Sequence, residues 1–103
     1  MGLLNIVLVC SAGMSTSMLV EKMRKAAKEE HVEATIQATS EADLGRFLDQ
    51  ADVILIGPQV RYLASKIESQ AGPYGIKVAV IDPVYYGLMD GAKVFEQARE
   101  LLK

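Results

Sequence analysis

The sequence contains a single cysteine, Cys10, among its 103 residues. One cysteine excludes a disulfide within the chain and is typical of a protein in a reducing compartment. No group of cysteine and histidine residues has the spacing of metal ligands, so we expect no metal site. Nothing in the chain calls for a cofactor, and we expect none.

Charge of one sign is not in excess either, since 11 basic and 13 acidic residues give a net charge of −2. This balance gives no electrostatic basis for binding nucleic acid or an anionic membrane surface. No apolar run reaches the roughly 20 residues that cross a bilayer, and the N-terminus does not have the pattern of a secretory leader. We therefore expect a cytoplasmic protein that does not insert into the membrane.

Hydrophobic residues, in contrast, are plentiful, at 50% of the chain. That share is enough for a core, and a chain of this length typically forms one domain. We see no repeat, low-complexity tract or linker, so we expect one domain over residues 1–103.

The hydrophobic pattern alternates between strand and helix signals. Continuous or alternating apolar residues predict strands, and apolar residues three or four apart predict helices. The predicted strands are residues 3–9, 33–38, 53–56 and 76–81, and the predicted helices are residues 16–31, a short one opened by Ser40, residues 63–71 and residues 90–102. This alternation predicts an α/β fold with a four-stranded parallel sheet in the order 2-1-3-4 and helices on both faces.

In such a sheet, ligands bind beyond the carboxyl ends of the strands, next to the point where the strand order reverses. Residues 10–17, 57–62 and 82–86 follow strands one, three and four, so they are expected to surround one site. Gln59, Asp82 and Tyr85 are candidates for its rim or for contacts with a partner. Their simpler interpretations are a solvated loop residue, a turn residue and a cover for the edge of the core.

Cys10 ends the first predicted strand and precedes a loop of small and hydroxyl residues and the start of a helix. A helix N-terminus offers free backbone N–H groups and the positive end of the helix dipole to an anion. The same field stabilises a thiolate. We therefore interpret Cys10 as a nucleophile rather than a buried structural thiol.

The predicted phosphate-binding loop consists of Ser11, Ala12, Gly13, Met14, Ser15, Thr16 and Ser17. It lacks the lysine of a nucleotide P-loop and the G-x-G-x-x-G pattern, which disfavours a nucleotide site.

Residues 9–19, V-C-S-A-G-M-S-T-S-M-L, resemble the active-site loop of the enzyme IIB components of the bacterial sugar phosphotransferase system, lactose/cellobiose (chitobiose) type. The resemblance continues through residues 51–60 and 80–87 and covers essentially the whole chain. It implies a four-stranded parallel sheet. It also implies that Cys10 takes a phosphoryl group from a phosphohistidine on a IIA protein. The phosphocysteine then passes it to a sugar, expected to be a β-linked disaccharide such as cellobiose or chitobiose, that enters through the IIC membrane transporter.

Three alternatives stay open. A low-molecular-weight phosphotyrosine phosphatase has the same architecture and a Cys-x5-Arg loop, and Asp82-Pro83 resembles its general acid. Here Thr16 stands where that loop has its arginine, so bidentate phosphate binding is lost. An arsenate-reductase-like enzyme would need further cysteines. A non-enzymatic phosphate-sensing module would use Cys10 only for packing.

Overall fold

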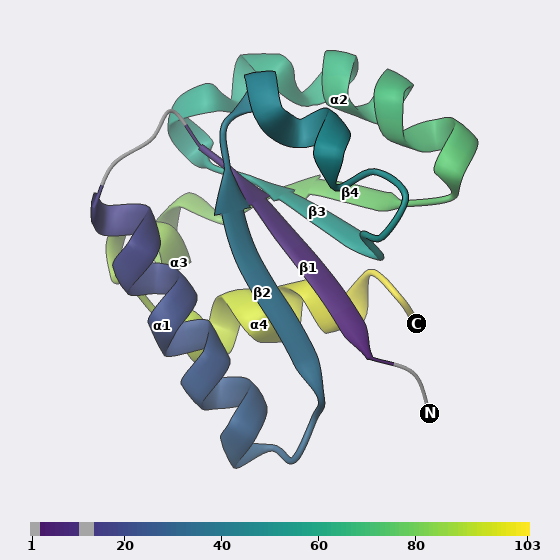
Figure 1. Cartoon of the computed structure of the whole chain (residues 1–103). Coiled ribbons are helices and arrows are strands. Elements are labelled where there is room, and N and C mark those ends of the chain that lie inside the picture. The colour runs from purple at the N-terminus through teal and green to yellow at the C-terminus, as the bar shows by residue number, and fades with distance from the viewer. Residues whose placement is uncertain (1–2, 11–13) are drawn as a thin grey trace.

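The computed structural model describes residues 3–10 and 14–103. Four strands form its centre: β1 (Leu4–Val9), β2 (Ala34–Thr39), β3 (Val53–Ile56) and β4 (Lys77–Val80). They are parallel and lie in the order β2-β1-β3-β4 (Figure 1). The predicted sheet and its strand order are therefore confirmed, with strand ends that differ from the prediction by at most one residue.

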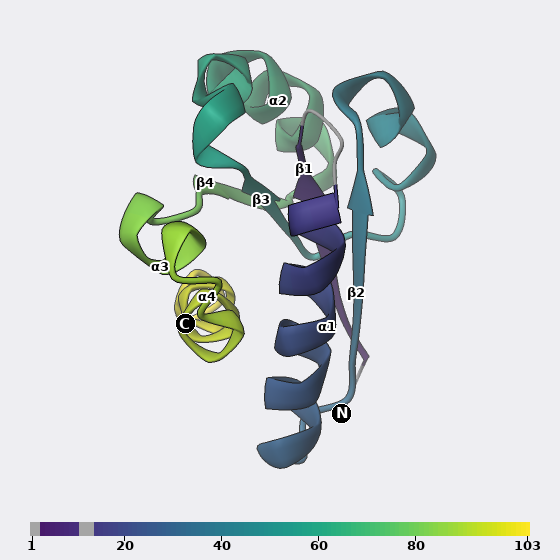
Figure 2. The same cartoon turned by 90° about the vertical axis from the view of Figure 1, so that its left-hand side faces the viewer.

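Helices cover both faces of this sheet. The α-helices are α1 (Met14–Glu29), α2 (Ala64–Ala71), α3 (Pro83–Gly87) and α4 (Gly91–Glu100), and the 3-10 helices are η1 (Glu41–Arg46), η2 (Pro58–Leu63) and η3 (Gly72–Tyr74). One apolar layer joins α1 and α4 to the sheet, and the other joins η1, η2 and α2 to its opposite face. Figure 2 shows α3 at the same end of the domain as the first turn of α1. Within the described part of the chain, no helix has the length and apolar character needed to cross a membrane.

Strand β1 is buried on both faces, which explains its unbroken run of apolar residues. Successive side chains of a strand point to opposite faces. Ile6, Leu8 and Cys10 accordingly belong to the layer under α1 and α4, whereas Val7 and Val9 belong to the layer under α2. Cys10 thus continues the inward-facing row of β1 by one residue.

Helix α1 begins at Met14, two residues earlier than predicted, so the predicted loop over residues 11–17 is too long. Met14, Ser15, Thr16 and Ser17 form the first helical turn instead of a loop. Serine and threonine are poor residues for a helix interior, which made this run resemble a loop. The first turn tolerates them because its N–H groups have no acceptor within the helix in any case.

Two other predicted segments differ from the structure. The short helix opened by Ser40 is a 3-10 helix, and the Ser40 side chain makes no capping hydrogen bond to its backbone. The predicted helix over 63–71 corresponds to α2 and starts one residue later, but η2, which precedes it and holds Val60 in a non-helical conformation, was not predicted.

Helix α3 was not predicted, because Asp82-Pro83 was interpreted as a turn. Asp82 caps this helix, with its Oδ1 accepting from the backbone N–H of Val84 at 2.8 Å. Pro83 occupies the first helical turn. Aspartate at the N-cap followed by proline is a recognised start of a helix, so the signal was present in the sequence.

Candidate active site

The carboxyl ends of the strands meet at one edge of the sheet. Val9 is the register partner of both Thr39 and Ile56, and Ile56 is the partner of Val80. Beyond the strands, Cys10 N donates to Thr39 O at 3.1 Å and Gly57 N donates to Val9 O at 2.9 Å. The backbone around Cys10 is therefore fixed by the strands on both sides, as the prediction of a site at this edge requires.

The Cys10 side chain is 3% exposed and packs in the core layer of α1 and α4. Only residues 11–13 separate it from Met14, where α1 begins. The first-turn N–H groups of α1 have no acceptor within the helix, and they lie at the positive end of its dipole. Burial in an apolar layer disfavours the thiolate, whereas the free N–H groups and the dipole at a helix start favour it.

The predicted phosphate-binding residues are only partly described. Ser11, Ala12 and Gly13 lie outside the described residues. Met14, Ser15 and Thr16 belong to the first turn of α1, and Ser17 is exposed and lines a shallow hollow between α1 and β2. The role of these residues in holding a phosphoryl group stays a prediction.

A hydrogen bond joins two segments that follow different strands. Gln59, in η2, donates from Nε2 to the Tyr86 hydroxyl in α3 at 2.8 Å. The carbonyl oxygen of the same amide, Oε1, lies 2.8 Å from the position that a Cβ on Gly57 would take, and Cys10 Sγ lies 3.4 Å from that position. Gln59 was predicted at the rim, and the structure places its amide oxygen and Cys10 Sγ around the same point beside Gly57. Its bond to Tyr86 was not predicted.

Tyr85 and Tyr86 are both partly buried against the core layer of α1 and α4. Tyr86 makes the hydrogen bond to Gln59, whereas Tyr85 packs against the core, in agreement with its simpler interpretation as a cover for the core edge. Tyr85 contributes its backbone carbonyl, which accepts from Asp90 N at 2.9 Å. A partner contact by Tyr85 stays a prediction.

Asp82 lies at the same edge of the sheet with its polar groups engaged in local structure. Its Oδ1 caps α3, and its backbone N–H donates to Gln97 Oε1 at 3.1 Å. The amide of Gln97 in turn donates to Val80 O at 2.9 Å. Gln97 therefore holds the chain where it passes from β4 to α3, and the carboxylate of Asp82 serves the helix that carries Tyr86.

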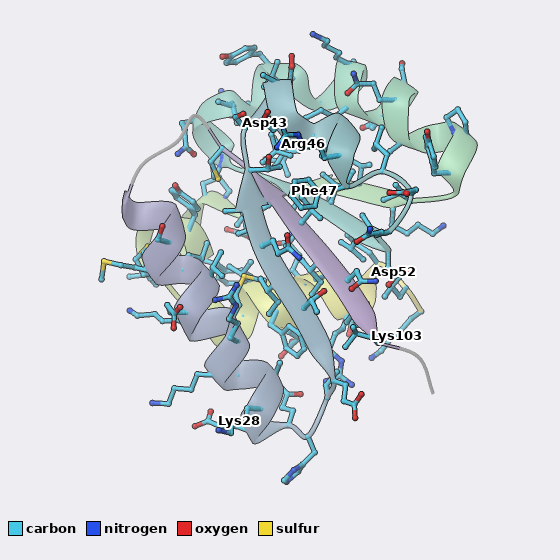
Figure 3. The ribbon with its side chains drawn as sticks, in the orientation of Figure 1. Lys28, Asp43, Arg46, Phe47, Asp52 and Lys103 are labelled. Carbon is cyan, nitrogen blue, oxygen red and sulfur yellow. The ribbon has the colours of Figure 1, made fainter. Side chains whose placement is uncertain are left out.

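Four of the seven exposed large apolar side chains among the described residues lie on segments that follow the carboxyl ends of the strands; the other three are Leu3, Tyr74 and Leu102. Met18 lies near the start of α1, Tyr62 in η2, and Val84 and Leu88 in and directly after α3, and all four are exposed. Charged side chains lie at both ends of the sheet: Figure 3 shows Lys28 at the far end of α1 and Asp52 beside the start of β1, and it shows Asp43 and Arg46 in η1, which follows β2. An apolar rim of this kind favours contact with other proteins.

Comparison with known proteins assigns the family. Residues 5–97 match the family model described as "PTS system, Lactose/Cellobiose specific IIB subunit". The chain is 44% identical to the oligo-beta-mannoside-specific EIIB component of Bacillus subtilis and 41% identical to the galactose-specific EIIB component of Lactococcus lactis, with 94% of both chains covered in each case. The solution structure of a cellobiose-specific phosphotransferase IIB component from Borrelia burgdorferi superposes with a TM-score of 0.80 and 43% identity, covering 97% of this chain and 92% of that one.

These matches confirm the resemblance of the sequence and agree with the fold. The family model covers the candidate site, including Cys10, Gln59 and Tyr86. The chain belongs to the lactose/cellobiose-specific IIB family of the sugar phosphotransferase system and is a phosphotransferase.

Proposed function

We propose that Cys10 carries the phosphoryl group of this phosphotransferase. Its thiolate attacks the phosphorus of a phosphohistidine on a IIA protein, so that an S–P bond forms while the N–P bond breaks and the imidazole leaves. The sugar hydroxyl then attacks the same phosphorus during transport through IIC, forming the sugar phosphate and restoring the thiol form of Cys10. Such transfers need a positioned nucleophile and stabilisation of the phosphoryl oxygens.

One observation carries this proposal: Cys10, at 3% exposure, ends the central strand, and α1 begins directly after residues 11–13. The exposed rim of Met18, Tyr62, Val84 and Leu88 at the same end supports docking of two protein partners in turn. We place the carrier in the cytoplasm, where it can meet both a IIA protein that carries a phosphohistidine and the membrane-embedded IIC.

The sugar is expected to be a β-linked disaccharide such as cellobiose or chitobiose. Relatives of nearly equal similarity are named for an oligo-beta-mannoside and for galactose. Because a carrier only presents the phosphoryl group, we assign selectivity for the sugar to the membrane partner. Transfer of label to candidate sugars, in the presence of membranes that contain IIC, tests this assignment.

A labelled phosphoryl group separates the carrier from the alternatives. We expect incubation with a phosphorylated IIA protein to leave stable label on this chain. A phosphatase-like enzyme would release inorganic phosphate. A phosphate-sensing module would neither keep the label nor release phosphate. Thr16 at the position of the phosphatase arginine and the engagement of Asp82 as a helix cap both favour the carrier.

Asp82→Asn should keep most of the phosphorylation by IIA. A phosphohistidine has a good leaving group, so the transfer needs no general acid at this position. Asparagine caps helices about as well as aspartate, so α3 should stay in place. The measurement is the rate of label transfer from phosphorylated IIA and the lifetime of the label on the variant. A loss of transfer as large as that caused by removing the Cys10 thiol would instead favour the phosphatase-like mechanism.

Backbone donors, rather than the side chain of Thr16, are expected to hold the phosphoryl group. Thr16→Ala should therefore cost less transfer activity than Gly13→Val, because a β-branched residue restricts the backbone of the predicted loop. Initial rates of label transfer to the two variants measure the difference. Loss of transfer in Thr16→Ala together with retention in Gly13→Val would show that the hydroxyl is the essential donor.

A further inference from the structure

We propose that the Gln59 amide and the Tyr86 hydroxyl form a switch that senses phosphorylation of Cys10, an inference that rests on the proposed function of Cys10. In the structure, Gln59 Nε2 donates to the Tyr86 hydroxyl at 2.8 Å. When Cys10 carries a phosphoryl group, the amide turns over and its N–H group faces the phosphoryl oxygens. The Tyr86 hydroxyl then donates to Gln59 Oε1.

The amide oxygen and the thiol both approach the position that a Cβ on Gly57 would take. Gln59 Oε1 and Cys10 Sγ lie 2.8 Å and 3.4 Å from the same point, the position of a Cβ on Gly57. Because residue 57 is glycine, it places no side-chain atom between the Gln59 amide and Cys10. The Gln59 amide therefore extends over Gly57 toward Cys10 at one end and reaches Tyr86 at the other.

The hydrogen-bonding chemistry of the groups determines which orientation each state prefers. A phosphoryl group attached to sulfur offers negatively charged oxygens, which attract donors and repel an amide oxygen. The amide of glutamine has a donor end and an acceptor end of nearly the same shape. A tyrosine hydroxyl both donates and accepts. Turning the amide thus replaces a repulsive contact by a charge-assisted hydrogen bond and keeps the bond to Tyr86.

The switch connects the site to the exposed rim. Tyr86 lies in α3 (Pro83–Gly87), which also carries Val84, and Leu88 follows directly. Val84 and Leu88 are exposed, while Tyr86 packs against the core. The hydrogen bond at Tyr86 therefore runs in opposite directions in the free and the phosphorylated chain. Tyr86 lies in the same segment as the exposed Val84 and Leu88, which are available to partners.

Nuclear magnetic resonance of the full chain tests the switch directly. After phosphorylation by IIA, we expect the side-chain NH₂ signals of Gln59 to shift and to show a coupling to phosphorus across the hydrogen bond. The side-chain signals of Gln37, which is exposed on β2, are the internal control and should not move. Phosphorylation of Cys10 with unchanged Gln59 signals would overturn the inference. Absence of phosphorylation would overturn the proposed function as well.

Variants test the energetic consequence. A carboxylate at position 59 still accepts from Tyr86 but has no N–H group for the phosphoryl oxygens. Gln59→Glu should therefore lower the equilibrium ratio of phosphorylated to free chain, at a fixed ratio of phosphorylated to free IIA, by about tenfold or more. The matched control, Gln70→Glu, adds the same charge on the exposed surface of α2 and should leave the ratio within about twofold.

Tyr86→Phe removes the hydroxyl and leaves the amide without its second partner. We expect a smaller reduction of the same ratio, about two- to fivefold, consistent with loss of one exposed neutral hydrogen bond. The inference is wrong if Gln59→Glu and Gln70→Glu give the same ratio. It is also wrong if Gln59→Glu slows transfer without changing the ratio, since that result would assign Gln59 to docking of IIA.

Discussion

Replacing Cys10 by serine should abolish acceptance of the phosphoryl group from phosphorylated IIA. A serine hydroxyl is almost entirely un-ionised near neutral pH and is a far weaker nucleophile than a thiol beside a helix N-terminus. We expect the rate of transfer to fall by about a thousandfold or more. The measurement is the initial rate of label transfer to wild-type and variant chains at equal concentrations of IIA.

The control for this variant is its stability. Because Cys10 is 3% exposed, serine places a hydroxyl in the core, at a cost of about 1–3 kcal/mol. The variant must therefore be shown to be folded, by circular dichroism and urea unfolding, under the conditions of the transfer assay. A folded Cys10→Ser chain that accepts label at the wild-type rate would remove Cys10 from the mechanism.

Gly91→Ala should destabilise the fold more than other small substitutions on this chain. A Cβ on Gly91 would lie 2.5 Å from the backbone carbon of Lys22 and 2.7 Å from the nitrogen of Met23. Glycine is therefore needed where α4 crosses α1, because the clash is mainly with backbone. Alanine normally favours a helix over glycine by about 1 kcal/mol. Here we expect overpacking to reverse the sign and to lower the free energy of unfolding by about 3 kcal/mol.

Urea unfolding measures this effect, with Gly45→Ala as the matched control. A Cβ on Gly45, in η1, meets no atom within 4 Å, so its unfolding midpoint should stay close to that of the wild type. Since α1 carries the residues that follow the candidate site, a shift of this helix in Gly91→Ala should also slow label transfer. A Gly91→Ala chain as stable as Gly45→Ala would contradict the close crossing of α1 and α4.

The sheet was predictable because its strands carry strong local signals. Strand β1 is a continuous apolar run, and so is β3, whose bounds at residues 53–56 were predicted without error. Alternation with helices then determines parallel pairing and leaves few possible strand orders. The position of Cys10 after β1 followed directly from these signals and is confirmed by the structure.

Other features depend on tertiary contacts that a sequence pattern does not contain. The bond between Gln59 and Tyr86 joins residues 27 positions apart, and no local periodicity relates them. Gly91 has the sequence context of a helix start, since Asp90 caps α4 through Lys93 N at 3.1 Å. Its second role is to let α4 pack closely against Lys22 of α1, and this role depends on the tertiary arrangement of the two helices. Helix α3 differs from these, because Asp82-Pro83 signalled it locally and was misinterpreted as a turn.

The most direct test of the account is to locate the phosphoryl group after reaction with phosphorylated IIA. Intact-mass measurement and peptide mapping at neutral to mildly alkaline pH should find one phosphoryl group per chain, on Cys10, and none on the Cys10→Ser chain. The label should then move to sugar when membranes that contain IIC are added. A phosphoryl group on any other residue, or release of inorganic phosphate with no label on the chain, would contradict the assignment of Cys10 as the carrier.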